Sequence, residues 1–312
     1  YMLNRLLTPC SILFSALFLL AAHGHAGDPT PWKAYASNNF VLYTDVKAKT
    51  AKSVLEEFET FRQAAQLVLG YSQKSDTVPV TIFYFDDRAQ YNAFYGDTNS
   101  SGFMMSTAYG PFIAVNPGSR ARPEEVLFHE YVHYLMYYKT SLSYPIWYSE
   151  GMAEFFETSR VKRGQYQIGV INKNNVQVFK RLGLLPTGLM ITPPPYEDWS
   201  DEYNWRFYAK AWATYHFLQI GPFTGAEDLR PQLQKYLSLY NEGVPSAEAF
   251  EQGFGITPQR LDTLVLGYLK ARPPSAPINL EKINFNVREL DTSAAREVRR
   301  FIREFIEKHD GR

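Results

Sequence analysis

The spacing of apolar and polar positions divides the chain into two unlike halves. Up to about residue 122, short apolar runs alternate with amphipathic segments. This pattern predicts strands at residues 39–44 and 78–85, one kinked strand or a strand pair at 107–116, and helices at 47–69 and 87–95. The run VPVTIFYF at 78–85 is apolar on both faces, as in a central strand. We therefore expect an N-terminal α/β layer built on a mixed sheet.

After residue 122 the apolar spacing becomes mostly helical. It predicts helices at residues 123–138, 149–158, 203–220, 227–240, 245–253 and 257–271. Pro123 followed by Glu124 and Glu125 suits a first helical turn, because proline fits there and acids face the positive end of the helix dipole. Residues 184–201 are rich in proline and polar side chains, so they predict a long loop. The Tyr, Trp and Pro residues of this loop make it a candidate wall for a cleft.

The first 26 residues have the layout of a secretion signal. Arg5 precedes an apolar stretch at residues 12–22, and small residues stand at −3 and −1 before Gly27. This stretch is too short to span a bilayer, which takes about 20 residues, so we expect a Sec signal peptide at residues 1–26. The only cysteine, Cys10, would leave with it. A secreted chain without cysteine is best suited to the periplasm of a Gram-negative bacterium.

The remaining chain divides near residue 272. We expect one large domain followed by a tail that begins at a proline-rich break. The predicted segments are the domain at 27–272, with an α/β part at 27–122 and a mainly helical part at 123–272, and the tail at 273–312, with a strand at 282–290 and a helix at 292–308. The tail either docks on the domain or binds a partner.

Composition narrows the range of partners. Of 312 residues, 45% are hydrophobic, which is too many for a disordered protein. The 32 basic residues balance the 32 acidic ones, so bulk charge gives no reason to expect nucleic acid or an anionic surface as partner. After signal cleavage, no apolar run is long enough for a stable membrane span. The oligomeric state is not indicated.

The stretch FHEYVHYL at residues 128–135 carries the strongest chemical signal, His-Glu-x-x-His. On a helix, His129 and His133 lie one turn apart on one face and can present two imidazoles to one ion. Glu130 lies about 100° around the helix, from where it can reach a metal-bound water as a general base. The match alone is weak, because two histidines and an acid also occur by chance on buried helices. Of the six histidines, however, only four lie beyond residue 26, and the motif holds two of them.

The next predicted helix offers a third ligand, in PIWYSEGMAEFFE at residues 145–157. A zinc site with two histidines and one glutamate takes its carboxylate from a second helix packed on the first. Glu150 lies 17 positions after His133, which leaves enough chain to turn back. Glu154, one turn further, either accepts the Nδ1–H of a ligand histidine or is simply a solvated helix acid.

These residues resemble the gluzincin metallopeptidases, in which His-Glu-x-x-His is followed by a ligand glutamate on the next helix. WYSEGMAEF is similar to the Trp-Leu-x-Glu-Gly-Phe-Ala run of aminopeptidase N relatives. Residues 32–220 resemble more closely the peptidase MA-like family of secreted bacterial proteins. The shared segments are the strands NFVLYTD and PVTIFYF and the helix FYAKAWATYHFL.

The resemblance implies an α+β zincin (thermolysin-like) fold whose catalytic domain is residues 27–272. It implies that Zn²⁺ is bound by His129, His133 and Glu150. With Glu130 as the base that activates a zinc-bound water, the chain would be a zinc metallopeptidase acting on a peptide or protein substrate.

Gluzincins also stabilise the oxyanion with a Tyr or His from a later helix. The resemblance makes Tyr208 and His216 the candidates, and Tyr208 has the better likeness. The alternative is that the helix face carrying these two residues is part of the core.

One departure concerns the segment before the motif. Aminopeptidase N relatives have Gly-x-Met-Glu-Asn there, and its glutamate holds the substrate amine. The corresponding GFMMS at residues 102–106 lacks the acid, so we expect a peptidase that is not an aminopeptidase. The strand that follows could pair with an extended substrate or be an ordinary sheet strand; it comprises Phe112, Ile113, Ala114 and Val115.

Two other functions remain open from the sequence. One is a non-catalytic periplasmic binding or cell-envelope module on a zincin scaffold, and the other is a zinc hydrolase of a non-peptide amide. The sequence favours the peptidase because the ligands and the base are all present, whereas a degenerate copy usually loses one of them.

Overall fold

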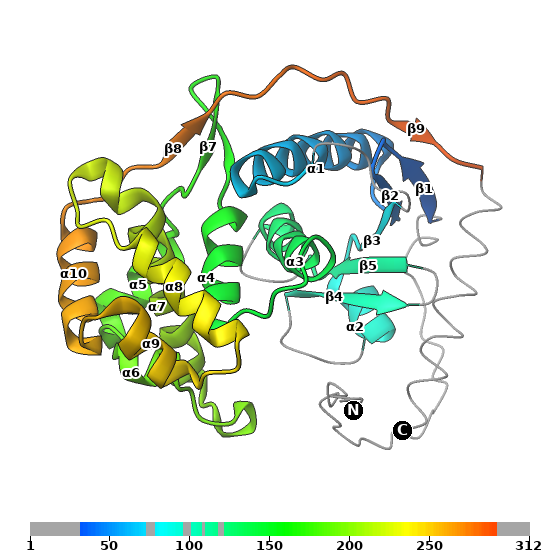
Figure 1. Ribbon diagram of the computed structural model, residues 1–312. Coiled ribbons are helices and arrows are strands. Elements are labelled where there is room, and N and C mark those ends of the chain that lie inside the picture. Colours follow the sequence, from blue (N-terminus) through cyan, green and yellow to red (C-terminus); the bar gives the residue numbers. More distant parts are fainter. Residues whose placement is uncertain (1–31, 73–78, 96–100, 108–109, 118–121, 292–312) are drawn as a thin grey trace, which may run out of the picture.

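The computed structural model describes residues 32–72, 79–95, 101–107, 110–117 and 122–291 (Figure 1). The expected signal peptide and the expected tail helix at 292–308 lie outside these residues. The described chain is a mixed α/β structure, with a mixed sheet in its N-terminal half and a mainly helical C-terminal half.

The main sheet combines parallel and antiparallel pairs. Its described strands are β1 (Lys33–Ala36), β2 (Phe40–Thr44), β3 (Val80–Tyr84), β4 (Gly102–Thr107), β5 (Gly110–Val115) and β9 (Arg288–Glu289). They follow the order β4-β5-β3-β2-β1-β9, in which β2, β3 and β5 run parallel and all other neighbours are antiparallel. The predicted strands at 39–44 and 78–85 are confirmed, and the prediction at 107–116 contains β5 but only the last residue of β4. Strand β1 has no sequence signal that we recognised.

Both faces of the central strand β3 are covered, as its sequence predicts. Ile82 belongs to the large core on one face, and Phe83 packs on the other face against Tyr43 and Phe112. Because alternate side chains of a strand point to opposite faces, a strand buried on both sides reads as a continuous apolar run.

Helices make up most of the remaining structure. They are α1 (Ala48–Leu69), α2 (Arg88–Tyr95), α3 (Pro123–Tyr138), α4 (Ile146–Glu157), α5 (Lys173–Leu182), α6 (Thr187–Ile191), α7 (Asp201–Ile220), α8 (Arg230–Asn241), α9 (Ser246–Phe254) and α10 (Pro258–Lys270), with short 3₁₀ turns η1 (Tyr196–Asp198) and η2 (Gly221–Thr224). The eight helices predicted between residues 47 and 271 are all present. The prediction of an unbroken loop at 184–201 is wrong, because α6 and η1 lie within it. A helix of five residues is too short for apolar periodicity to reveal.

An aromatic stack fixes α3 against α1 and the sheet. The rings of Phe61 on α1 and Phe128 on α3 are parallel, with centroids 4.0 Å apart. Phe40 of β2, Phe58 and Tyr131 extend the stack, and all five rings are fully buried. Because one side of α3 packs on α1 and the sheet, the opposite side of α3 faces α4.

The described part of the tail docks on both halves of the chain. Strand β8 (Ala276–Ile278) pairs with β7 (Gln165–Ile168), which also pairs with β6 (Arg160–Lys162) in a small antiparallel sheet. The tail then passes α1 and ends in β9 beside β1 (Figure 1). The strand predicted at 282–290 is therefore reduced to the two residues of β9.

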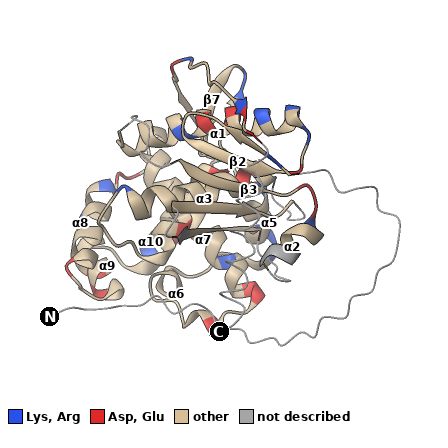
Figure 2. Cartoon of the chain, turned by 90° about the vertical axis from the view of Figure 1, so that its right-hand side faces the viewer, with Lys and Arg blue, Asp and Glu red and all other residues tan. Residues whose placement is uncertain are grey.

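Charged residues of both signs are interspersed over the helices and loops in the view of Figure 2. None of the helices among the described residues is long and apolar enough to cross a membrane.

Candidate metal centre

Helix α3 carries a narrow polar stripe on an otherwise buried helix. Pro123 opens it, and the side chain of Glu125 accepts the backbone N–H of Arg122 at 3.3 Å, which satisfies one of the free donors at the helix start. Residues on most of its faces are buried, but the side chains of His129 and His133 keep 15% and 21% of their surface exposed. These two histidines therefore lie at the margin of the core, open to one side.

Helix α4 brings the third side chain into position by packing closely on α7. A methyl group added at Gly151 would lie 2.5 Å from the carbonyl oxygen of Ala211, so this close approach requires glycine. Glycine is therefore needed at position 151 so that α4 can pack closely on α7. This packing fixes the position of the preceding residue, Glu150, opposite the two histidines of α3.

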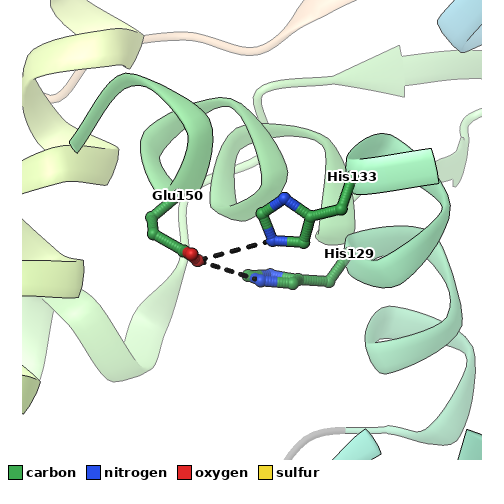
Figure 3. A group of neighbouring side chains, drawn as sticks. All are labelled: His129, His133 and Glu150. Atoms are coloured by element: carbon green, nitrogen blue, oxygen red, sulfur yellow. Dashed lines mark ion pairs between the residues drawn. The ribbon is translucent and has the colours of Figure 1, made fainter. Parts of the chain in front are cut away.

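The side chains of His129, His133 and Glu150 converge on one point (Figure 3). Oε2 of Glu150 lies 3.3 Å from Nε2 of His129 and 3.5 Å from Nε2 of His133. Ligand atoms about 2.0–2.1 Å from a tetrahedral zinc ion are separated by roughly 3.3–3.5 Å. Oε2 is also buried and has no well-aligned hydrogen bond to any described residue. The spacing and the donor types both fit a zinc ion.

Both imidazoles are held by their other nitrogen. Nδ1 of His129 lies 3.0 Å from Oε2 of Glu157, and Nδ1 of His133 lies 3.2 Å from Oγ of Ser149. Ser149 donates to the sulfur of Met136, so its oxygen is available to accept the His133 Nδ1–H. With Nδ1 protonated on each ring, both Nε2 lone pairs point at the convergence point.

Glu157 has the role that the sequence assigned to Glu154. Glu154 instead accepts from the side-chain amides of Asn172, at 3.2 Å, and Asn175, at 2.8 Å. Asn172 also donates to Oε1 of Glu157 at 2.7 Å, so it links the two carboxylates. Burial and, to a smaller extent, the charge of the adjacent Glu157 raise the pKa of Glu154 to about 8. The sequence signal for Glu157 was its spacing of seven from Glu150, which we did not use.

The electrostatic field at the convergence point favours a cation. Burial raises the pKa of Glu150, but the two facing imidazoles outweigh it and hold the pKa well below its ordinary value. Burial lowers the pKa of His129, yet Glu150 and Glu157 outweigh it and raise the pKa well above its ordinary value. A site that retains positive charge in spite of burial is one in which a metal cation is also stabilised.

Glu130 lies near both the converging ligands and the edge of the sheet, since His129, His133, Glu150 and the backbone of Met104 all affect its pKa. Its carboxylate accepts the backbone N–H of Met104 in β4, and burial raises its pKa above the ordinary value. Met104 pairs with Ile113 on its other side, so Glu130 contacts the outer edge of β4. Glu130 is therefore placed beside, and not within, the group of converging ligands.

The expected substrate strand is not available for pairing. Strand β5 (which contains Phe112, Ile113, Ala114 and Val115) has β3 on one edge and β4 on the other, so its ladder positions are already used. The prediction of strand addition at these four residues is wrong for that reason. Among the described strands, β4 is the one at this edge of the sheet.

Tyr208 and His216 have different environments although both are on α7. Burial raises the pKa of Tyr208 well above its ordinary value, and the charges of Glu150, Glu154 and Glu130 add to this effect, which places the phenol in the field of the site. His216 is fully buried, with Nδ1 2.8 Å from the hydroxyl of Tyr268 and Nε2 2.8 Å from the carbonyl oxygen of Gly169. Because both ring nitrogens are bound within the core, His216 is not an oxyanion donor.

The arrangement is thus a half-buried group of three side chains that could hold a metal ion, with a carboxylate and a phenol beside it. A family model described as "Protein of unknown function (DUF1570)" matches residues 125–191, which include all three converging residues. No curated protein matches the chain.

Proposed function

We propose that the protein is a zinc-dependent peptidase of the gluzincin type. The observation that carries this proposal is the convergence of Nε2 of His129, Nε2 of His133 and Oε2 of Glu150, with 3.3 and 3.5 Å between carboxylate and imidazoles. A zincin fold belongs to the same proposal, and it is supported by the mixed sheet of the N-terminal half and by the packing of α3 against α4.

These three residues would bind the ion, and Glu157 and Ser149 would hold the imidazoles in the metal-binding tautomer. A bound zinc ion supplies a Lewis acid that acidifies water and polarises a carbonyl oxygen. Two histidines and one carboxylate leave room for a further ligand, which is the pattern of catalytic rather than structural zinc sites.

Glu130 is the proposed general base. Its carboxylate lies next to the converging ligands and its pKa is raised by burial, which makes it a better proton acceptor than a solvated glutamate. It takes a proton as water attacks the peptide carbonyl, and it gives that proton to the amine nitrogen as the C–N bond breaks.

Tyr208 and β4 complete the proposed site. The raised pKa of Tyr208 keeps its phenol protonated at neutral pH, so it can donate a hydrogen bond to the oxyanion. Strand β4 stands at the end of the described strand order, so its outer edge is the one at which an extended peptide could be added to the sheet. The described residues Gly102 to Met105 of β4 contain no acid, which agrees with an activity other than aminopeptidase.

Zinc content and peptide hydrolysis test the proposal together. We expect about one zinc per chain by elemental mass spectrometry, and loss of zinc in His133→Ala. Glu130→Gln should keep the zinc and lose cleavage of an unstructured protein such as casein. Glu124→Gln, the same change in the first turn of α3, is the matched control and should retain activity. A Glu130→Gln protein as active as wild type would disprove the mechanism, and a wild type that binds no zinc would favour a non-catalytic binding module.

Export is a separate part of the proposal. If the signal peptide is cleaved, the protein recovered from the periplasmic fraction should begin at Gly27, which N-terminal sequencing can determine.

A further inference from the structure

Asn172, the residue immediately before α5, is buried and connects that helix to the acids behind the proposed metal ligand His129. Its Oδ1 accepts the backbone N–H of Asn174 at 3.0 Å and that of Asn175 at 3.2 Å, which caps the start of α5. A flipped amide would bring the NH₂ group of Asn172 against these two donors. The cap therefore fixes the orientation of the amide and directs its NH₂ group away from α5.

The NH₂ group of Asn172 is shared between two carboxylates. Nδ2 lies 2.7 Å from Oε1 of Glu157 and 3.2 Å from Oε2 of Glu154. An amide nitrogen carries two hydrogens, so it can donate one to each acid. The shorter of the two bonds goes to Glu157, which is the acid that also contacts His129.

The two oxygens of Glu157 have separate partners. Oε1 accepts from Asn172, and Oε2 lies 3.0 Å from Nδ1 of His129. The last side-chain torsion of a glutamate has only a broad preference, so a carboxylate without a second partner is free to turn away from the ring. Because the carboxylate is planar, the bond at Oε1 also sets the direction of Oε2. Glu154 is held separately, since it accepts from Asn175 at 2.8 Å.

We propose that Asn172 is a positioning residue of the metal centre. Its amide orients Glu157, and this carboxylate in turn orients the His129 ring so that Nε2 faces Glu150. The inference rests on the proposed function, because it treats His129 as a metal ligand. It adds to the two helices of the site a residue from the connection between β7 and α5, so the start of α5 affects metal affinity.

Asn172→Ser separates the two roles of this side chain. Serine caps a helix about as well as asparagine, so α5 keeps its N-cap, whereas the NH₂ group that binds Glu157 is lost. We expect zinc affinity, measured by competition with a chelator, to fall about tenfold or more. Cobalt(II) bound in place of zinc reports the geometry of its ligands through its visible absorption, and this spectrum should change as well.

Asn175→Ser is the matched control. It makes the same substitution in the first turn of α5 and removes another buried amide donor, but that donor binds Glu154 and not Glu157. We expect a clearly smaller loss of zinc affinity and the cobalt spectrum of wild type. Urea unfolding of both variants shows whether a change in affinity merely follows a loss of stability. Equal affinities and spectra in the two variants would overturn the proposal, because Asn172 would then be no more than a helix cap.

A measurement on metal-free protein separates this inference from the proposed chemistry. In protein labelled with nitrogen-15 histidine, the Nδ1–H signal of His129 is identified by its absence in His129→Gln. The hydrogen bond to Glu157 should slow the exchange of this proton with water in wild type and in Asn175→Ser, and the exchange should be faster in Asn172→Ser.

That result supports the positioning role even if wild type binds no zinc and cleaves nothing, in which case the proposed function alone has failed. An Nδ1–H that exchanges equally slowly in Asn172→Ser and in wild type would overturn the role of Asn172.

Discussion

Oε2 of Glu157 lies 3.0 Å from Nδ1 of His129, whereas Nε2 of the same ring faces Glu150. The contact with Glu157 therefore fixes the orientation of the imidazole. Helix geometry explains why this residue, and not Glu154, reaches the ring. Seven residues correspond to a net rotation of about 20° from Glu150, whereas four correspond to about 40°. Glu157 therefore lies more nearly in line with Glu150 along α4.

Loss of this contact should weaken metal binding. In Glu157→Gln, we expect zinc affinity to fall about 10-fold or more, because an amide is a poorer acceptor for the Nδ1–H and does not raise the basicity of the ring. Competition with a chelator of known affinity measures the change. Glu154→Gln is the matched control on the same helix, and its effect should be clearly smaller because Glu154 bonds to Asn172 and Asn175. A larger effect from Glu154→Gln would reverse the assignment of the two acids.

Tyr208 should affect turnover and not metal binding. Removal of one oxyanion donor lowers kcat by about 10²–10³-fold in comparable sites, so we expect a loss of this size in Tyr208→Phe with little change in KM. Steady-state kinetics on one peptide, together with zinc content, distinguishes this from a damaged site. Unchanged kcat would show that the phenol is only part of the packing.

The parts of the site that could be predicted from the sequence depend on local spacing. The His129 and His133 pair follows from one helical turn, and Glu150 follows from a second helix that returns after a short connection. The errors concern contacts between distant segments. His216 is bound by Tyr268 and Gly169, 52 and 47 positions away, and no local pattern reveals such partners.

The same reason explains the error in the sheet. An apolar run shows that β5 is buried, but it does not show which strands lie beside it. The neighbouring strand β4 is less apolar, and the sequence prediction included only its last residue. Its position beside β5 is known only from the pairing in the structure, in which Met104 lies opposite Ile113. Pairing between strands is set by side-chain packing across the sheet and not by the strand alone.

The buried His216 should make stability depend on pH. Burial lowers its pKa to about 4 in the folded chain, against an ordinary value of 6.5, while Nε2–H donates to Gly169 and Nδ1 accepts from Tyr268. Between pH 4 and 6.5 the unfolded chain therefore binds more protons at this residue, so its contribution is complete above pH 6.5 and is lost as pH falls toward 4. The loss amounts to about 3 kcal/mol at 1.36 kcal/mol per pKa unit.

Urea unfolding of wild type and His216→Gln at several pH values measures this contribution. The other titrating groups are common to both proteins, so the difference between them isolates His216. We expect the stability of wild type to decline more steeply than that of the variant between pH 6.5 and 4. Parallel curves would mean that His216 is solvated or charged in the folded protein.

Gly151 links the stability of the fold to the position of Glu150. In Gly151→Ala the new methyl group would lie 2.5 Å from the carbonyl oxygen of Ala211, so α4 must move away from α7. Overpacking of this kind lowers stability by about 1–3 kcal/mol, and the shift should also weaken zinc binding because Glu150 is the adjacent residue.

Gly267→Ala on α10 is the matched control, since an added methyl group there meets no atom within 4 Å. Alanine is the better helix former by up to about 1 kcal/mol, so the control should be neutral or more stable. Urea unfolding and chelator competition on both variants measure the two effects, and equal behaviour of the two would show that α4 is not held at this contact.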